Sequence, residues 1–163
     1  MCRYYNWQRL RKIIKIRMKK LILALLVAAA CVPAIAQKTP KGVTYDAQVL
    51  RVSDGDTIVI AAPFLPAPLK PELAVRIFGV DTPEKGHRAQ CPQEDQRAQL
   101  ASKYTSQLIQ QGGKIQVTLY AWDKFGGRVL GDILVNGQSV RTGLIQNGLA
   151  REYYGDAKQS WCN

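Results

Sequence analysis

The sequence predicts an α+β fold in which three strands, a helix, two strands and a short helix follow one another. In five short segments apolar residues alternate with polar ones, which is the period of a half-buried strand. Between the third and the fourth segment, apolar residues recur at the spacing of an amphipathic helix. In this order, the elements are those of an OB-type five-stranded β-barrel with a helix after strand three and a short C-terminal helix.

The first three strands are expected at residues 43–52, 57–61 and 73–80. The turn Asp54-Gly55-Asp56 separates the first two strands, because an Asp-Gly pair favours a tight reversal. Four prolines between residues 63 and 71 lack the donors of a sheet ladder, so this segment is expected to be a surface loop.

The first helix is expected to begin at Cys91-Pro92, where a proline in the first turn is followed by acidic residues. Gly112-Gly113 is expected to terminate it. The fourth and fifth strands are expected at residues 115–121 and 129–135. Ser139 can cap a short second helix that ends at Gly148.

The N-terminal 36 residues are predicted to be an extension and signal peptide, followed by a linker at 37–42 and a single domain at 43–163. These 36 residues hold eight of the 23 Lys and Arg and no acid. The rest of the chain has 23 − 8 = 15 basic and 12 acidic residues, so its net charge is +3, compared with +11 for the whole chain. A basic pair, an apolar stretch at 21–31 and small residues before Gln37 predict cleavage after Ala36 and a periplasmic or secreted protein. The mildly basic mature part favours a local phosphate site over a long basic groove.

Other interpretations of the N-terminus remain open at this stage. The segment could be retained as a membrane anchor, or carry a lipid on Cys31, and translation could start at Met1 or Met18. For the cleaved chain we expect a monomer with no membrane contact and no stable protein partner.

Two of the four cysteines, Cys91 and Cys162, remain after the predicted cleavage. An even count in an exported chain favours a disulfide, and two unpaired thiols are the alternative. The chain has no CxxC pair and one histidine, so a zinc site is not expected.

Four carboxylates and one arginine lie close together around the ends of two expected strands. Because closely placed carboxylates repel one another, they favour a hard divalent cation, and oxygen ligands suit calcium or magnesium. An arginine offers a planar donor fork for a phosphate. Taken singly, the aspartates could be solvated turn residues, and the glutamate could be an acid in a first helical turn. The residues concerned are Asp54, Asp56, Arg76, Asp81 and Glu84.

The order and spacing of four motifs resemble the staphylococcal nuclease (thermonuclease) family, from about Val43 to about Tyr154. The motifs are Asp54-Gly55-Asp56-Thr57, the run from Arg76 to Glu84, Asp123-Lys124-Phe125-Gly126-Gly127-Arg128, and Asn147-Gly148-Leu149-Ala150. That family has the OB-type fold with calcium in its active site.

The resemblance implies a role for each site residue. Asp56, Asp81 and the backbone carbonyl of Thr82 would hold Ca²⁺, with Asp54 behind them. Glu84 would act as the general base or orient the attacking water. Arg76 and Arg128 would clamp the phosphate.

Two aromatic residues are expected to contact the substrate. Phe125 occupies a place where many relatives have a tyrosine, so it keeps a stacking surface and loses a hydroxyl. Tyr154 is closest to the family's base-stacking tyrosine.

The function expected from this resemblance is an exported calcium-dependent nuclease for DNA and RNA with little sequence specificity, leaving 3′-phosphate ends. The alternatives are a non-catalytic OB module that binds single-stranded nucleic acid and an envelope protein anchored by residues 1–36. Retention of Asp56, Arg76, Asp81, Glu84 and Arg128 favours the enzyme.

Overall fold

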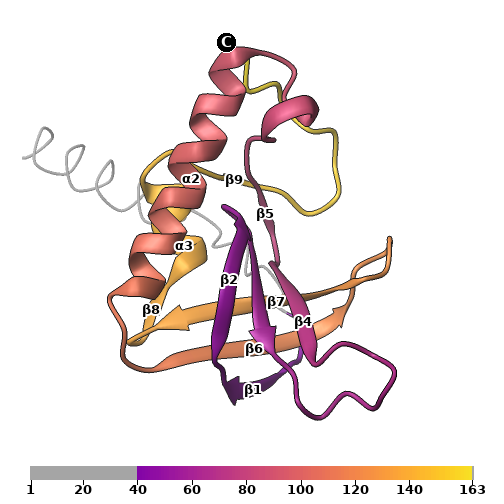
Figure 1. The fold of residues 1–163 in the computed structure, drawn as a ribbon. Helices are drawn as coiled ribbons and strands as arrows, with labels where there is room; N and C mark the ends of the chain where they lie inside the picture. Colours follow the sequence, from indigo (N-terminus) through magenta and orange to yellow (C-terminus); the bar gives the residue numbers. More distant parts are fainter. Residues whose placement is uncertain (1–39, 163) are drawn as a thin grey trace, which may run out of the picture. The chain divides into compact units, whose positions relative to one another are not determined.

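The computed structural model describes residues 40–162, so the predicted signal peptide, its cleavage site and the first half of the predicted linker lie outside the described residues. None of the helices between residues 40 and 162 has the length and apolar character needed to cross a membrane. The helices of this part, shown in Figure 1, are η1 (Gly86–Arg88), α2 (Pro92–Gln110) and α3 (Val140–Gln146). Its strands are β1 (Val43–Asp46), β2 (Val49–Asp54), β3 (Thr57–Ala61), β4 (Glu72–Ile77), β5 (Val80–Asp81), β6 (Ile115–Trp122), β7 (Arg128–Val135), β8 (Gln138–Ser139) and β9 (Arg151–Glu152).

The α+β prediction is confirmed, with a mostly antiparallel sheet. The hydrogen-bonded path runs β1-β6-β7-β4-β3-β2, β8 adds to β7, and β5 pairs with β9 in a separate small sheet. The β4–β7 pair is parallel, and the other pairs are antiparallel. Among the described strands, β1 and β2 stand at the two ends of this path, so the sheet is open and its closure into a barrel is not seen.

The prediction of one continuous strand at residues 43–52 is wrong. β1 pairs with β6, whereas β2 pairs with β3 at the other end of the sheet. The chain changes partner between the two strands: the Ala47 amide donates to the Ile115 carbonyl, and the Ala61 amide donates to the Gln48 carbonyl, both at 2.9 Å. Alternation of apolar residues continues through such a change, because it reports burial and not the identity of the neighbouring strand.

The expected strand at residues 73–80 is also interrupted. A turn at Phe78-Gly79 separates β4 from β5, and Gly79 has a φ of 73°, a left-handed conformation that favours glycine. After the turn the chain leaves the main sheet and pairs with β9. This break carries Asp81 off the main sheet and toward the C-terminal segment.

The core lies between the main sheet and the two α-helices. Ile58, Val75, Val117 and Ile133 are completely buried side chains of β3, β4, β6 and β7. α2 faces them with small buried residues (Ala98, Ala101 and Thr105), which lets its backbone approach closely. Ser139 caps α3 as predicted, because its hydroxyl accepts the amide of Thr142 at 3.2 Å.

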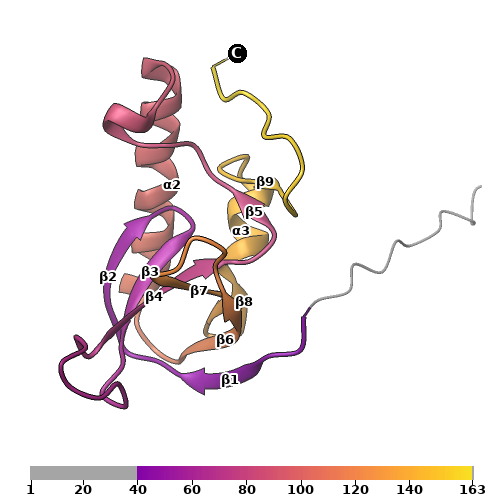
Figure 2. The same ribbon diagram turned by 90° about the vertical axis from the view of Figure 1, so that its right-hand side faces the viewer.

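The predicted disulfide between Cys91 and Cys162 is present, with the two Cα atoms 5.8 Å apart. It joins the residue before α2 to the end of the described chain. Figures 1 and 2 show the segment after β9 lying on the side of the main sheet where α2 begins, opposite the 63–71 loop. The bond therefore fixes this segment, residues 156–162, which we call the C-terminal tail.

The disulfide should contribute substantially to stability, because it spans 71 residues of sequence. In the chain-entropy model, a loop of this size adds about 4 kcal/mol by restricting the unfolded chain. We expect Cys162→Ser to lower the free energy of unfolding by up to about this amount in guanidinium titrations. The parent protein in reductant should show the same loss, and the variant should not respond to reductant. A parent curve unaffected by complete reduction would contradict the prediction.

Candidate active site

The turn Asp54-Gly55-Asp56 is held against helix α2. A Cβ built on Gly55 would lie 2.6 Å from the Cβ of Ala101, so no larger residue fits without displacing the turn or the helix. The buried hydroxyl of Thr105 donates to the Gly55 carbonyl at 2.7 Å. Glycine at this position and small residues on α2 therefore set the position of Asp56 relative to the helix.

Asp56 is a buried carboxylate paired with Arg76. Its side chain accepts Thr57 Oγ1 at 2.8 Å and Arg76 Nε at 3.1 Å. Arg76 lies opposite Thr57 in the β3–β4 register. Burial disfavours the charged guanidinium, but the carboxylates around it, Asp56 above all, outweigh burial and raise the pKa of Arg76. Arg76 is thus a fixed cation and not an outward surface residue.

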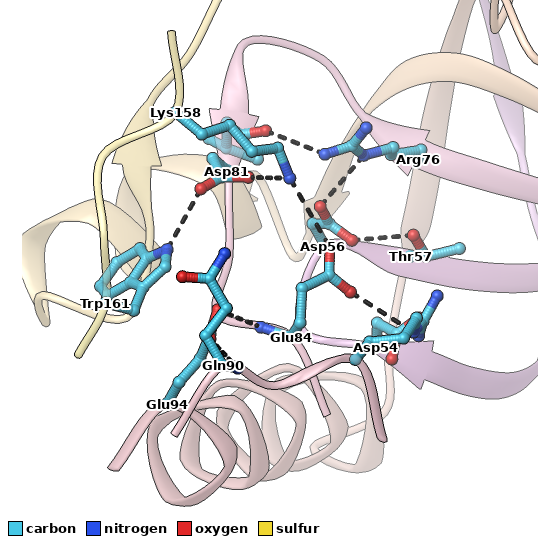
Figure 3. Close-up of polar contacts among 12 residues, drawn as sticks. Asp54, Asp56, Thr57, Arg76, Asp81, Glu84, Gln90, Glu94, Lys158 and Trp161 are labelled. Atoms are coloured by element: carbon cyan, nitrogen blue, oxygen red, sulfur yellow. Dashed lines mark hydrogen bonds and ion pairs between the residues drawn. The ribbon is translucent and has the colours of Figure 1, made fainter. Parts of the chain in front are cut away.

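Asp81 is the second buried carboxylate, and it receives two contacts from the C-terminal tail (Figure 3). The indole Nε1 of Trp161 donates to Oδ2 at 3.1 Å. The ammonium of Lys158 lies 2.8 Å from Oδ1. This oxygen is fully buried and has no hydrogen bond of normal geometry among the described residues, so the lysine contact is an ion pair. Because Asp56 and Asp81 are both almost fully buried, the interpretation of these residues as solvated turn residues is excluded.

Glu84 lies in an irregular segment before η1, outside any helix, so the interpretation as a first-turn helix acid is wrong. Its carboxylate is partly exposed, at 38%, and faces Arg88 and Lys158 at 3.5 and 3.6 Å. Its backbone amide donates to Oε1 of buried Glu94 at 3.2 Å, and the Gln90 amide donates to Oε2 at 2.7 Å. Glu94 therefore ties both ends of the 84–90 segment to the start of α2.

A turn between β6 and β7 presents Arg128 beside the buried carboxylate of Asp123. Arg128 Nη2 lies 2.6 Å from Asp123 Oδ2. Burial would raise the pKa of the Asp123 carboxyl, but the hydrogen bond from Arg128 and that from the Phe125 amide hold it below its usual range. Gly126 and Gly127 both have a φ of 72°, so the second glycine continues a left-handed turn.

Asp54 lies beside these groups and binds two cations. Its carboxylate oxygens are 3.0 Å from Lys85 Nζ and 3.6 Å from Arg88 Nη2. Because both cations come from the segment around η1, Asp54 joins the turn before β3 to the segment that carries Glu84.

These side chains line a cleft of about 310 Å³. Its lining contains five cationic side chains and four carboxylates, so its net charge is 5 − 4 = +1. With the carboxylate of Asp81, which lies beside the cleft, the net charge becomes zero. The lining includes Asp54, Asp56, Arg76, Thr82, Glu84, Arg88, Asp123, Lys124, Phe125, Arg128, Tyr153 and Lys158. Asp81 lines an adjoining pocket of about 510 Å³ that shares Thr82, Glu84, Arg88 and Lys158 with the cleft. The predicted metal and phosphate residues are thus brought together.

The two predicted aromatic contacts lie differently. Phe125 stands at the cleft with 78% of its surface exposed. Tyr154 is outside the cleft lining, with its ring edge-on to Phe78 and its hydroxyl accepting from Arg141 at 2.6 Å. Its neighbour Tyr153 lines the cleft. A stacking role for Tyr154 stays a prediction.

Sequence reasoning missed Arg88, Lys158 and Trp161. Arg88 lies beyond the motif that ends at Glu84, and no spacing rule connects Lys158 to Asp81, 77 positions earlier (158 − 81). Trp161 carried a usable signal: it precedes the cysteine expected to join the tail to the first helix, so it had to lie near that helix.

The donor atoms at this site fit calcium. Asp56 and Asp81 supply carboxylate oxygens, Thr82 has a backbone carbonyl, and the buried Oδ1 of Asp81 accepts no normal hydrogen bond. Within residues 40–162, no three His, Cys, Asp or Glu side chains are grouped so as to hold a metal by themselves. Calcium commonly completes its shell with carbonyls and water, so two carboxylates and one carbonyl are a suitable core.

Clustered carboxylates beside two guanidiniums, on an open OB-like sheet, define a phosphodiesterase class of site. The staphylococcal nuclease homologue family model matches residues 74–161, more than half of the chain. The chain belongs to this family.

A curated relative is similar over a larger part of the chain. Endonuclease YhcR of Bacillus subtilis (strain 168) is 32% identical over 116 residues, which is 68% of this chain and 9% of that protein. The chain thus spans about a tenth of that relative's length. Family membership and this relative together support a nuclease function.

The two carboxylate oxygens of Glu94 accept hydrogen bonds from two backbone amides on the segment that carries Glu84, so Glu94 should stabilise this segment. Glu94→Gln keeps the shape but replaces one acceptor by a donor, leaving one amide unpaired. We expect a loss of about 1–3 kcal/mol in the free energy of unfolding, with faster hydrogen exchange at the amides of Glu84 and Gln90.

Glu72→Gln is the matched control, because Glu72 is a surface carboxylate paired with Arg51. Its effect should stay within about 0.5 kcal/mol. Equal stability losses in the two variants would contradict the role given to Glu94.

Proposed function

We propose that this chain is an exported, calcium-dependent nuclease that hydrolyses phosphodiester bonds of DNA and RNA with little sequence specificity. Export is proposed from residues 1–36 and is supported by the Cys91–Cys162 disulfide, a bond typical of oxidising compartments. The observation that carries the nuclease proposal is the single cleft that holds Asp56, Arg76, Glu84 and Arg128, with Asp81 beside it.

Glu84 is the residue placed to handle the attacking water. It is the most exposed of the carboxylates Asp54, Asp56, Asp81 and Glu84. Its neighbours Arg88 and Lys158, at 3.5 and 3.6 Å, hold the carboxylate in place at the cleft. As general base or as the group that orients water, Glu84 would direct an oxygen lone pair at phosphorus.

Arg76 and Arg128 would stabilise the negative charge that builds on the non-bridging oxygens. Each is oriented by a buried carboxylate, Asp56 for Arg76 and Asp123 for Arg128. Within residues 40–162, the ion pair between Asp123 and Arg128 uses only the Nη2 atom of the arginine. The remaining donors of its planar fork suit a phosphate, and a preorganised donor adds no reorganisation cost during reaction.

Calcium would be held by Asp56, Asp81 and the Thr82 carbonyl. When bound, it would supply a Lewis acid that polarises the phosphate. Asp54 would support this site from behind, since its ion pairs with Lys85 and Arg88 connect the Asp56 turn to the Glu84 segment.

Low sequence specificity is proposed from the character of the cleft. Its contacts with substrate are charged groups suited to phosphate, together with the exposed ring of Phe125. Phosphate contacts carry no base information, and stacking on an aromatic ring accepts any base. From the family resemblance we expect 3′-phosphate ends.

A single experiment separates the enzyme from a binding-only module. Purified protein is incubated with single- and double-stranded DNA and RNA, with calcium or with chelator, and the product ends are identified. We expect cleavage with calcium and none with chelator. Binding without cleavage under both conditions would support the alternative module.

The two carboxylates assigned different roles should respond differently to substitution. Asp81→Ala removes a metal ligand, so both calcium binding and cleavage should be lost. Glu84→Gln removes the group that handles water, so turnover should fall by about 10²–10⁴-fold while calcium binding is retained. Calorimetric calcium titration and initial rates measure the two effects separately. Cleavage by Glu84→Gln at the parent rate would show that Glu84 has no part in the reaction.

Lysine replacements test whether the arginines act through their fork. Arg76→Lys and Arg128→Lys keep the charge but lose the bidentate geometry. We expect each to reduce the cleavage rate by about 10²-fold or more at saturating calcium. Arg51→Lys, on the surface ion pair with Glu72, is the matched control and should leave the rate unchanged. Parent-like rates in both cleft variants would remove the clamp from the mechanism.

A further inference from the structure

The C-terminal tail makes two contacts of different kinds with Asp81, one on each carboxylate oxygen. Trp161 donates a hydrogen bond to Oδ2, and Lys158 places its ammonium against Oδ1 (Figure 3). Asp81 is one of the two carboxylates assigned to calcium above, so both contacts concern the cation site directly.

The Trp161 contact is rigidly held. The side chain is only 5% exposed, and the Arg151 guanidinium stacks 3.8 Å from its ring centroid. Arg151 lies opposite Asp81 in the β5–β9 pair and also donates to the Ser160 carbonyl at 2.9 Å. The next residue is the disulfide partner of Cys91. A donor fixed in this way determines which direction the Asp81 carboxylate faces.

The Lys158 contact is displaceable. Its side chain is 47% exposed, and residues 156–160 of the tail are all exposed. The ammonium bridges Asp81 at 2.8 Å and Glu84 at 3.6 Å, so it neutralises two carboxylates that would otherwise repel each other. A cation shared between these carboxylates is in the place where a metal ligated by Asp81 would act. Once a metal neutralised Asp81, the exposed lysine could withdraw into solvent without leaving the buried carboxylate uncompensated.

We propose that the C-terminal tail is a built-in part of the cation site: Lys158 holds the place of calcium at Asp81 until the metal displaces it, and Trp161 fixes the carboxylate that both cations use. The proposal rests on the calcium site of the proposed function. It assigns Lys158 as an internal competitor and Trp161 as a positioning residue.

The two residues should affect calcium affinity in opposite directions, which calorimetric titration of the metal-free full domain measures without any turnover. Lys158→Met removes the competitor, so calcium should bind about tenfold more tightly. Trp161→Phe keeps an aromatic ring but loses the donor, so calcium should bind about 10–100-fold more weakly.

Two control variants match these changes. Lys124→Met removes an equal charge from the same cleft, where Lys124 contacts the Phe125 ring, and should change affinity by no more than about twofold in 0.15 M salt. Trp122→Phe alters an exposed tryptophan on β6 and should change nothing. Thermal unfolding of each variant establishes that it is folded.

A second readout follows the contact itself. The indole N–H resonance of Trp161 should shift on calcium addition in the parent and in Lys158→Met, while that of Trp122 stays in place. An unmoved Trp161 resonance on calcium saturation would contradict its assignment as a positioning residue.

The outcomes separate this inference from the proposed function. A parent protein that binds no calcium would overturn both. If the parent binds calcium and Lys158→Met binds it no more tightly than Lys124→Met, the competitor role is overturned while the calcium site stands. If Trp161→Phe is folded and binds calcium as the parent does, the positioning role is overturned.

Discussion

The constraint on which the site depends is the repulsion between carboxylates gathered in one small, partly buried volume. Asp56, Asp81 and Asp123 are nearly inaccessible to water, and each lies within 3.1 Å of a cationic nitrogen. An isolated buried carboxylate would cost several kcal/mol, so each of these needs its partner. The pairing fixes the positions of the cations as well as those of the anions. In the proposed function, this cluster accepts a phosphate together with a divalent cation.

Two kinds of partner compensate these charges. Arg76 and Arg128 reach the carboxylates from strands of the main sheet and belong to the framework. Lys158, by contrast, reaches Asp81 from an exposed segment beyond the sheet. Asp81 and Glu84 therefore share a compensating cation that can leave without disturbing a strand.

The sequence predicted most of the fold, because alternation, turn chemistry and helical spacing are local signals. It predicted the helix start at Pro92 and the cap at Ser139. It failed where a strand changes partner, at Ala47-Gln48 and at Phe78-Gly79, since periodicity does not record which strand lies alongside. It also missed Lys158, because an ion pair between distant segments leaves no pattern in the chain.

Helix α2 acts as a common reference for parts of the site that come from different regions of the chain. Gly55 contacts it through Ala101 and Thr105, Glu94 holds the Glu84 segment at its first turn, and Cys91 just before it secures the tail. The spacing between the Asp54-Gly55-Asp56 turn, the segment that carries Glu84 and the C-terminal tail is thus set by one helix and not by the open sheet. A displacement of the edge strand β1 would leave all three of these attachments to α2 in place.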